Sequence, residues 1–186
     1  MNIPSHPLDF QDRDELRSWL QSNHAAEREA WVEILKNQTP RPGVYYEEAV
    51  EEAVCFGWID GGMKGSAGGF YYLRFTPRKP GSVWSVSNQR RVERLIAQGR
   101  MTEAGMAKVR EAQENGEWEA AIRREDTSTL PDDLSRALES SPPAQANFEN
   151  FPASQKKQYL YWLASAKTEK TRLKRIQKIV EMATRT

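Results

Sequence analysis

The sequence predicts an α+β fold, with a small antiparallel sheet packed with helices and followed by a C-terminal helical bundle. Two observations point to it. Segments of strand-like composition lie between residues 30 and 76, mixed with helical segments. The remainder of the chain has helical periodicity, punctuated by proline and glycine. The 186 residues, 38% of them apolar, suffice for one domain, or one domain and a small appendage, with a real core.

Helical and strand signals alternate over the first part of the chain. Residues 12–22 predict a helix with Asp12 as its N-cap, and residues 30–36 predict a strand. Residues 46–56 predict a second helix, because small apolar residues recur at helical spacing and a glycine follows. Four glutamates lie on the other face of this helix, where we expect them to face water: Glu47, Glu48, Glu51 and Glu52.

Two further strands are predicted around a glycine-rich turn at residues 65–69. Residues 58–64 predict one strand, interrupted at Gly61–Gly62. Residues 70–76 predict the other, which is rich in aromatic residues. Successive side chains of a strand alternate between its two faces. The residues of the second strand that we expect to face the core are Tyr71, Leu73 and Phe75.

Two helices follow these strands. Ser85 or Ser87 can cap a helix that ends near Gln98. Thr102 can cap the next helix, which Gly116 can end. The apolar residues expected on the inner faces of the two helices are Val92, Leu95, Ile96, Met106 and Val109.

A polar stretch without periodicity divides the chain. We expect an N-terminal α+β domain over residues 1–122, a linker over 123–131 and a C-terminal helical domain over 132–186. Prolines and a serine open three helices of the last segment, and a basic helix ends it. The inner face of that final helix is expected to consist of Leu173, Ile176 and Val180.

The composition limits the class of protein. Cys55 is the only cysteine, so no disulfide can form within the chain, and folding needs no oxidising compartment. No signal peptide is visible in residues 1–10, and no apolar stretch reaches the roughly 18 residues of a membrane span. We therefore expect a cytoplasmic protein without membrane insertion. The sequence does not indicate its oligomeric state.

Catalytic and cofactor motifs are missing from the sequence. The two histidines, His6 and His24, are not close to Cys55 in sequence, and that cysteine is best explained as a small core residue. No GxSxG, Walker or strand-linked GxGxxG motif occurs. The glycines at 65–69 lack the helix that follows a phosphate-binding loop, so they predict a hairpin turn. We expect no cofactor and no metal site, and we assign no catalytic residue.

Charge is distributed unevenly, although the net charge is only +1. Residues 1–63 carry a net charge of −7 and residues 64–110 one of +8. Residues 111–151 carry −7 and residues 152–186 carry +7. Two basic blocks can indicate an anionic partner. Alternatively, the blocks neutralise each other within the fold, which the near-zero sum favours.

Basic and aromatic residues gather in the sequence between the second helix and the third. Such a mixture can bind phosphates and stack bases, and the free N–H groups of a loop and a helix start favour an anion. The alternative is that the rings belong to the core and the basic groups form a solvated rim. The residues predicted to form a binding surface are Trp58, Asp60, Lys64, Arg74, Arg78, Lys79, Trp84 and Asn88.

Asp60 allows two interpretations. Beside Lys64 and Arg74 it can form a structural ion pair. It can also be a carboxylate held for acid–base chemistry in a deep pocket. The ion pair is favoured, because structural pairs of this kind are commoner than catalytic carboxylates.

Four long runs of the sequence are distinctive: YEEAVEEAVCFGWIDG (46–61), YLRFTPRKPGSVWSVSN (72–88), VERLIAQGRMTEAG (92–105) and FPASQKKQYLYWLASAKTEKTRLKRIQKIVEM (151–182). These runs resemble the YdeI/OmpD-associated family, also called the bacteriocin-protection family. The resemblance extends over about residues 12–183. It implies association with an outer-membrane porin and protection from bacteriocins, and it implies no catalytic residue.

Three functions follow from these observations. The first is a non-enzymatic protein that binds an anionic small molecule or a nucleic acid at the predicted surface. The second is an enzyme of unknown class that uses Asp60 as an acid or base. The third is a module that binds a protein partner through an exposed apolar strip on residues 169–183.

Overall fold

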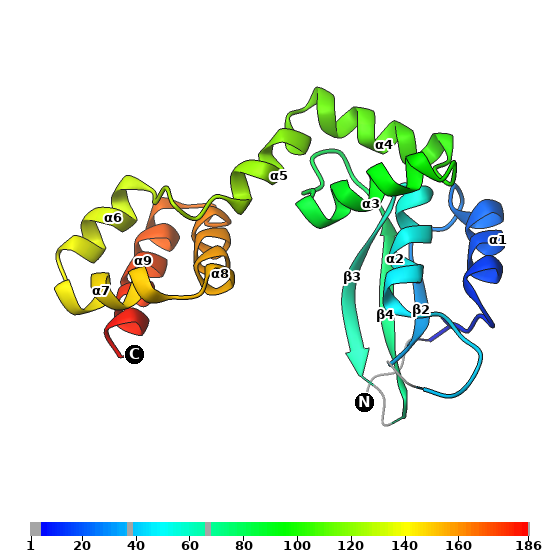
Figure 1. The fold of residues 1–186 in the computed structure, drawn as a ribbon, viewed down its shortest axis with the longest axis horizontal. Helices are drawn as coiled ribbons and strands as arrows, with labels where there is room; N and C mark the ends of the chain where they lie inside the picture. Colours follow the sequence, from blue (N-terminus) through cyan, green and yellow to red (C-terminus); the bar gives the residue numbers. More distant parts are fainter. Residues whose placement is uncertain (1–4, 37–38, 66–67, 186) are drawn as a thin grey trace. The chain divides into compact units, whose positions relative to one another are not determined.

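The computed structural model describes residues 5–36, 39–65 and 68–185. The chain divides into two compact units, Met1–Ala121 and Ile122–Thr186. Strands and helices build the first unit, whereas the second is helical in its described residues, so the fold is α+β as predicted (Figure 1). No helix within the described ranges is long and apolar enough to cross a membrane.

The first unit begins with a very short strand, which the sequence did not reveal. Its elements are β1 (Pro7–Leu8), α1 (Arg13–Asn23), β2 (Ala30–Leu35), α2 (Tyr46–Cys55), β3 (Trp58–Gly65), β4 (Phe70–Pro77), α3 (Val86–Ala97) and α4 (Glu103–Glu114). A further helix, α5 (Glu117–Glu125), crosses the division between the units. The first residues of the expected linker are therefore helical. The hairpin turn predicted at residues 65–69 includes 66 and 67, which lie outside the described residues.

The strands form one sheet in the order β1-β2-β4-β3. The pairs β2–β4 and β4–β3 are antiparallel, as predicted, but β1 runs parallel to β2. The sheet is therefore mixed. A strand of two residues is too short to show alternation, which is why the parallel edge could not be recognised.

A β-bulge interrupts β3 at the predicted glycines. Asp60 pairs with Phe75, whereas Met63 pairs with Leu73, so three steps along β3 match two along β4. Because of the extra residue, each side chain beyond the bulge lies on the opposite face from the one that simple alternation predicts. This shift decides where the predicted site residues lie.

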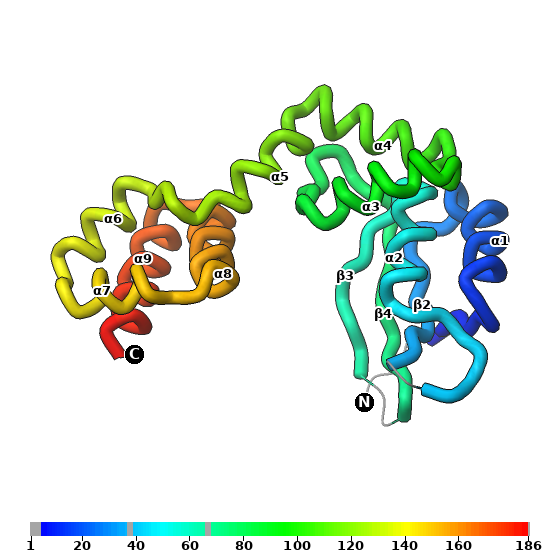
Figure 2. The backbone as a smooth tube through the Cα atoms, viewed as in Figure 1, coloured from blue at the N-terminus to red at the C-terminus, as the bar shows by residue number. Residues whose placement is uncertain are grey.

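Helix α2 covers one face of the sheet, and α1 and α3 pack beside it (Figures 1 and 2). The predicted apolar stripe of α2 is buried in the first core, together with Leu73 and Phe75 of β4. The predicted N-caps of three helices are also confirmed: Asp12 for α1, Ser85 for α3 and Thr102 for α4. Ile96 was wrongly placed on the inner face of α3, since 47% of its surface is exposed.

Helix α4 packs directly on the end of α2. A Cβ atom added to Gly105 would lie 2.3 Å from the carbonyl oxygen of Cys55. The Thr102 hydroxyl donates to the same oxygen at 2.6 Å. Only glycine permits this approach, so the start of α4 is fixed against the helix that carries the acidic residues.

In its described residues the second unit holds four helices after α5, and these have their own apolar core. Leu134, Phe148, Leu163 and Ile179 are completely or almost completely buried in it. Leu173 was wrongly predicted to face inward, since 53% of its surface is exposed. It is the exception among the large apolar residues at 169–183, so a continuous apolar strip is not present there. The helices are α6 (Asp132–Glu139), α7 (Pro142–Asn150), α8 (Ala153–Ala164) and α9 (Glu169–Thr184).

Candidate functional site

Only part of the predicted binding surface comes together. Arg78, Lys79 and Trp84 line one small cavity beside α4. The other five residues of the predicted surface are not among its lining residues. These eight positions were grouped because they lie close together along the chain. Proximity in sequence does not specify which face of a strand a side chain takes or how deeply it is buried.

Trp58 and Asn88 have structural roles in the first unit. Trp58 is buried in the core, and its indole N–H donates to the backbone carbonyl of His24 at 3.2 Å. Asn88 lies in the first turn of α3, and its side-chain oxygen accepts a hydrogen bond from Arg91 at 3.0 Å. Both side chains therefore have partners within the fold.

Lys64 and Arg74 lie on the sheet face opposite the core. Lys64 pairs in register with Tyr72, and Arg74 with Trp31. The Lys64 ammonium lies 4.5 Å from the centre of the Trp31 ring, and Arg74 forms an ion pair of 2.7 Å with Glu29. Both cations are therefore occupied on that face.

The predicted ion pair between Asp60 and these cations is wrong. Asp60 pairs in register with Phe75, whose side chain faces the core, so Asp60 lies on the helix-covered face. The bulge after Asp60 places Lys64 on the opposite face, although the two are four residues apart. Asp60 instead accepts a hydrogen bond of 3.1 Å from the hydroxyl of Tyr46. Burial raises the pKa of Tyr46 to about 12, and the negative charge of Asp60 is the second cause of this rise.

Arg78 is the least satisfied charged group of the predicted surface. Its side chain follows the end of β4, and only 3% of the residue is exposed. One terminal nitrogen donates to the backbone carbonyl of Val83 at 3.2 Å, but Nε and Nη2 are buried without a hydrogen-bond partner among the described residues. The guanidinium carbon lies 3.7 Å from the centre of the Trp84 ring. Burial lowers the pKa of Arg78 to about 10, although the negative charge of Asp60 acts to raise it.

The cavity at Arg78 is small and has a polar rim. Its volume is about 10 Å³, which is the room that one water molecule needs. Lys79 and Asn115 contribute to its lining, as do Lys108 and Glu111, which form an ion pair with each other at 2.7 Å. The cavity can therefore admit a group of one or two atoms to the guanidinium.

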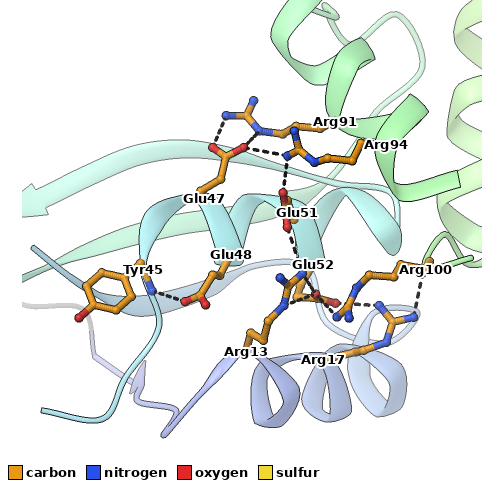
Figure 3. Close-up of polar contacts among 10 residues, drawn as sticks. All are labelled: Arg13, Arg17, Tyr45, Glu47, Glu48, Glu51, Glu52, Arg91, Arg94 and Arg100. Atoms are coloured by element: carbon orange, nitrogen blue, oxygen red, sulfur yellow. Dashed lines mark hydrogen bonds and ion pairs between the residues drawn. The ribbon is translucent and has the colours of Figure 1, made fainter. Parts of the chain in front are cut away.

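A cluster of glutamates and arginines, which the sequence did not reveal, lies between α1, α2 and α3 (Figure 3). At its centre Glu52 is completely buried. Its carboxylate accepts hydrogen bonds from three guanidiniums: Arg13 Nε at 3.0 Å, Arg17 Nη1 at 2.7 Å and Arg100 Nη2 at 2.6 Å. Burial raises the pKa of Glu52, but the three hydrogen bonds outweigh it and hold the pKa below its ordinary value.

The cluster continues along α2 toward its N-terminus (Figure 3). Glu51 accepts hydrogen bonds from Arg13 and Arg94. Glu47 lies one turn earlier and accepts two from Arg91, at 2.7 and 2.9 Å. The prediction that the glutamates of α2 face water is therefore wrong for Glu51 and Glu52. Helical periodicity shows which residues share a face, but not that arginines from other segments cover it.

These contacts join charge blocks of opposite sign. In the first unit, arginines of the basic block 64–110 bind glutamates of the acidic block 1–63. In the second unit, Arg172 pairs with Asp133, and Lys157 with Glu125. The alternative in which the blocks neutralise each other therefore holds for these groups. Arg78 of the predicted surface forms no ion pair with a carboxylate in the described residues.

The comparisons with protein families match two different parts of the chain. Residues 8–108, more than half of the chain, match the family described as Domain of unknown function (DUF8412). The chain belongs to this family. Residues 127–186 match the family described as Bacteriocin-protection, YdeI or OmpD-Associated, in agreement with the predicted family. Searches of curated proteins and of solved structures gave no match.

The DUF8412 match contains the whole glutamate–arginine cluster and Arg78. The match ends at residue 108, so it does not include Glu111 of α4 and the following Asn115, which also line the small cavity. Three of the runs that resemble the bacteriocin-protection family lie in this DUF8412 match, and the fourth lies in the C-terminal match. In the described residues, no group of three or more His, Cys, Asp and Glu side chains could hold a metal ion.

Proposed function

We propose that this chain is a non-enzymatic binding protein that holds a small anion against Arg78. The observation that supports this function is the buried guanidinium, two nitrogens of which lack a hydrogen-bond partner in the part of the chain that the structure describes. Buried donors without partners cost free energy, and their rarity in folded proteins calls for an explanation such as a bound ion or water. An anion would satisfy the donors and the charge together.

The surroundings of Arg78 favour a small anionic group. The cavity accommodates about one water-sized group, so the ligand is a halide or a short carboxylate end rather than a base or a ring. Lys79 and Lys108 add positive charge at the lining, and Glu111 is already engaged with Lys108. Trp84 covers one face of the guanidinium and leaves its edge for hydrogen bonds.

Thermal unfolding tests this function. The protein is heated in sodium chloride, sodium formate and sodium phosphate at equal ionic strength, beside the Arg78→Met variant in the same solutions. We expect chloride or formate to raise Tm in a saturable way for the unmodified chain only. A ligand at a hundred times its Kd stabilises by about 2.7 kcal/mol. Equal responses of both proteins to every anion would refute the proposal.

A nucleic-acid ligand is the alternative outcome of the same experiment. Short single-stranded DNA would then raise Tm where the small anions do not, and the effect would fall steeply with salt because bound counterions are released. Lys79→Ala would weaken such binding, since backbone phosphates are held by exposed cations rather than by buried ones.

Protection from bacteriocins or a related stress, exerted from the cytoplasm, is the physiological role in this proposal. Its support is the C-terminal match to the bacteriocin-protection family. A strain that lacks the protein should be more sensitive to a bacteriocin, and the unmodified gene should restore resistance while the Arg78→Met gene does not. Full complementation by that variant would separate the physiological role from anion binding.

A further inference from the structure

A second pocket, much larger than the cavity at Arg78, opens where the C-terminal part of α1 meets the start of α4. Its volume is about 370 Å³, which lies within the range of small-molecule sites. Neither the sequence nor the family matches point to it. The residues that line it include Arg17, Gln21, His24, Phe56, Thr102 and Glu103.

Arg17 gives this pocket a fixed positive charge. Its two terminal nitrogens donate to Glu52 at 2.7 Å and to the backbone carbonyl of Arg100 at 2.8 Å, so the guanidinium is held in place. Arg13 and Arg100 share the same Glu52 carboxylate. The three arginines around Glu52 carry more positive charge than this one carboxylate neutralises. Glu51, which is bound to Arg13, offsets only part of the excess. The wall at Arg17 therefore favours an anion.

Glu103 also lines the pocket, but its carboxylate forms an ion pair with Arg110. The remaining polar groups of the pocket suit hydroxyl groups. His24 has Nδ1 at 2.9 Å from the backbone carbonyl oxygen of Leu20, so Nδ1–H donates to that oxygen, and in the neutral imidazole Nε2 is then an acceptor. The side chain of Gln21 is exposed and has both a donor and an acceptor to offer. The Phe56 ring is covered by Arg17 and His24, so the pocket offers no free ring for stacking.

We propose that this pocket binds a small hydroxylated anion, such as a sugar phosphate or a hydroxy acid. The anionic group lies toward Arg17, and hydroxyl groups bond to Gln21 and to Nε2 of His24. Thr102 contributes shape only, because its hydroxyl already donates to the carbonyl of Cys55. This site is separate from the cavity at Arg78 and takes a larger ligand.

Gln21 is the position for a clean test, because it is exposed and its side chain takes part in no hydrogen bond within the described ranges. Binding of glucose 6-phosphate, glycerol 3-phosphate and citrate is followed by NMR shifts of the Gln21 and His24 signals, with glucose and inorganic phosphate as partial ligands. We expect saturable shifts with at least one of the hydroxylated anions, and at least tenfold weaker binding of glucose and phosphate.

Charge variants then locate the ligand. Gln21→Glu should weaken binding roughly threefold and Gln21→Lys should strengthen it by a similar factor, because the added charge lies within a few ångströms of the anion. Ser22→Glu, the neighbouring exposed residue on α1, adds the same net charge outside the pocket and should leave the affinity nearly unchanged.

Two results would overturn the inference. One is that none of the three anions shifts these signals, and the other is that Gln21→Glu and Ser22→Glu weaken binding equally. Shifts confined to residues around Arg78 would also contradict this second site, and they would agree with the proposed function. The failures of the two proposals are therefore distinguishable.

Discussion

Two buried charges in the first unit differ in how the fold compensates them. Glu52 is fully buried and accepts hydrogen bonds from three guanidiniums. Arg78 is nearly as buried, but within residues 5–36, 39–65 and 68–185 no carboxylate pairs with it and two of its nitrogens have no partner. Both lie in the same unit, and Glu111, which lines the cavity at Arg78, pairs with Lys108 instead.

Under the proposed function, this difference separates a structural charge from one that is held for a ligand. Removing one partner of a well-satisfied buried ion pair leaves an uncompensated charge, so a cluster such as that of Glu52 is costly to break. A buried cation without a partner weakens the fold, and it is retained where binding compensates for it. The following predictions test whether the two sites behave in these opposite ways.

The largest effect is expected for Glu52→Gln. The variant leaves Arg13, Arg17 and Arg100 without their shared carboxylate, at a cost of about 3–5 kcal/mol in the free energy of unfolding. Urea unfolding measures it. Glu47→Gln on the same helix is the control, because the side chain of Glu47 is 52% exposed and such a pair contributes at most about 1 kcal/mol. Equal losses in both variants would contradict the special role of Glu52.

Acid should destabilise the fold through the same carboxylate. Burial raises the pKa of Glu52, but its arginine bonds hold it below the ordinary value of 4.5. A group whose pKa is lower in the folded state stabilises the fold above its unfolded pKa. This contribution is complete above pH 4.5 and is lost as the pH falls through the folded pKa. Stability curves between pH 3 and 7 should therefore be flatter for Glu52→Gln than for the unmodified chain.

A small effect on stability is expected for Arg78→Met. Methionine retains most of the contact with Trp84 and removes a buried charge that lacks a carboxylate. The free energy of unfolding without added anion should change by less than about 1 kcal/mol, in either direction. A loss as large as that of Glu52→Gln would show that Arg78 stabilises the fold itself, and the contrast between the two sites would then fail.

The smallest effect is expected for Asp60→Asn. Asp60 acts on Arg78 electrostatically without a hydrogen bond between them, and its negative charge opposes an incoming anion. The variant should tighten formate or chloride binding a few-fold, as measured by the rise of Tm with anion concentration. Tyr46→Phe removes the hydroxyl that bonds to Asp60 and changes no charge, so it should leave the anion affinity unchanged.

Local signals in the sequence were sufficient for most helices and strands. Capping residues fixed the starts of α1, α3 and α4, and alternation placed Leu73 and Phe75 in the core. Helix α5 and strand β1 were missed. The first lies in a stretch whose many charged residues obscure helical periodicity, and the second has too few residues to show any pattern.

The candidate site was predicted in part, for reasons that lie beyond local pattern. The loop after β4 correctly suggested that Arg78, Lys79 and Trp84 lie together. A one-residue bulge places Asp60 and Lys64 on opposite faces of the sheet. Two glycines in the sequence indicated where the strand is interrupted, but not that the interruption exchanges the faces of the residues beyond it. The burial of Glu52 depends on Arg13, Arg17 and Arg100, which come from distant segments, so no window of sequence around α2 contains the information.

The Glu52 cluster also sets an order on how the first unit can form during synthesis. Two of its arginines precede Glu52 in the chain by 39 and 35 residues, whereas Arg100 follows it by 48. At roughly 5–20 residues per second, the ribosome adds Arg100 roughly 2–10 s after Glu52. Until then, the Glu52 carboxylate is only partly neutralised, although it lies on the side of α2 that will be buried. The nascent chain therefore completes this unit only when the start of α4 has emerged, and a chain that ends before residue 100 should remain a target for proteases.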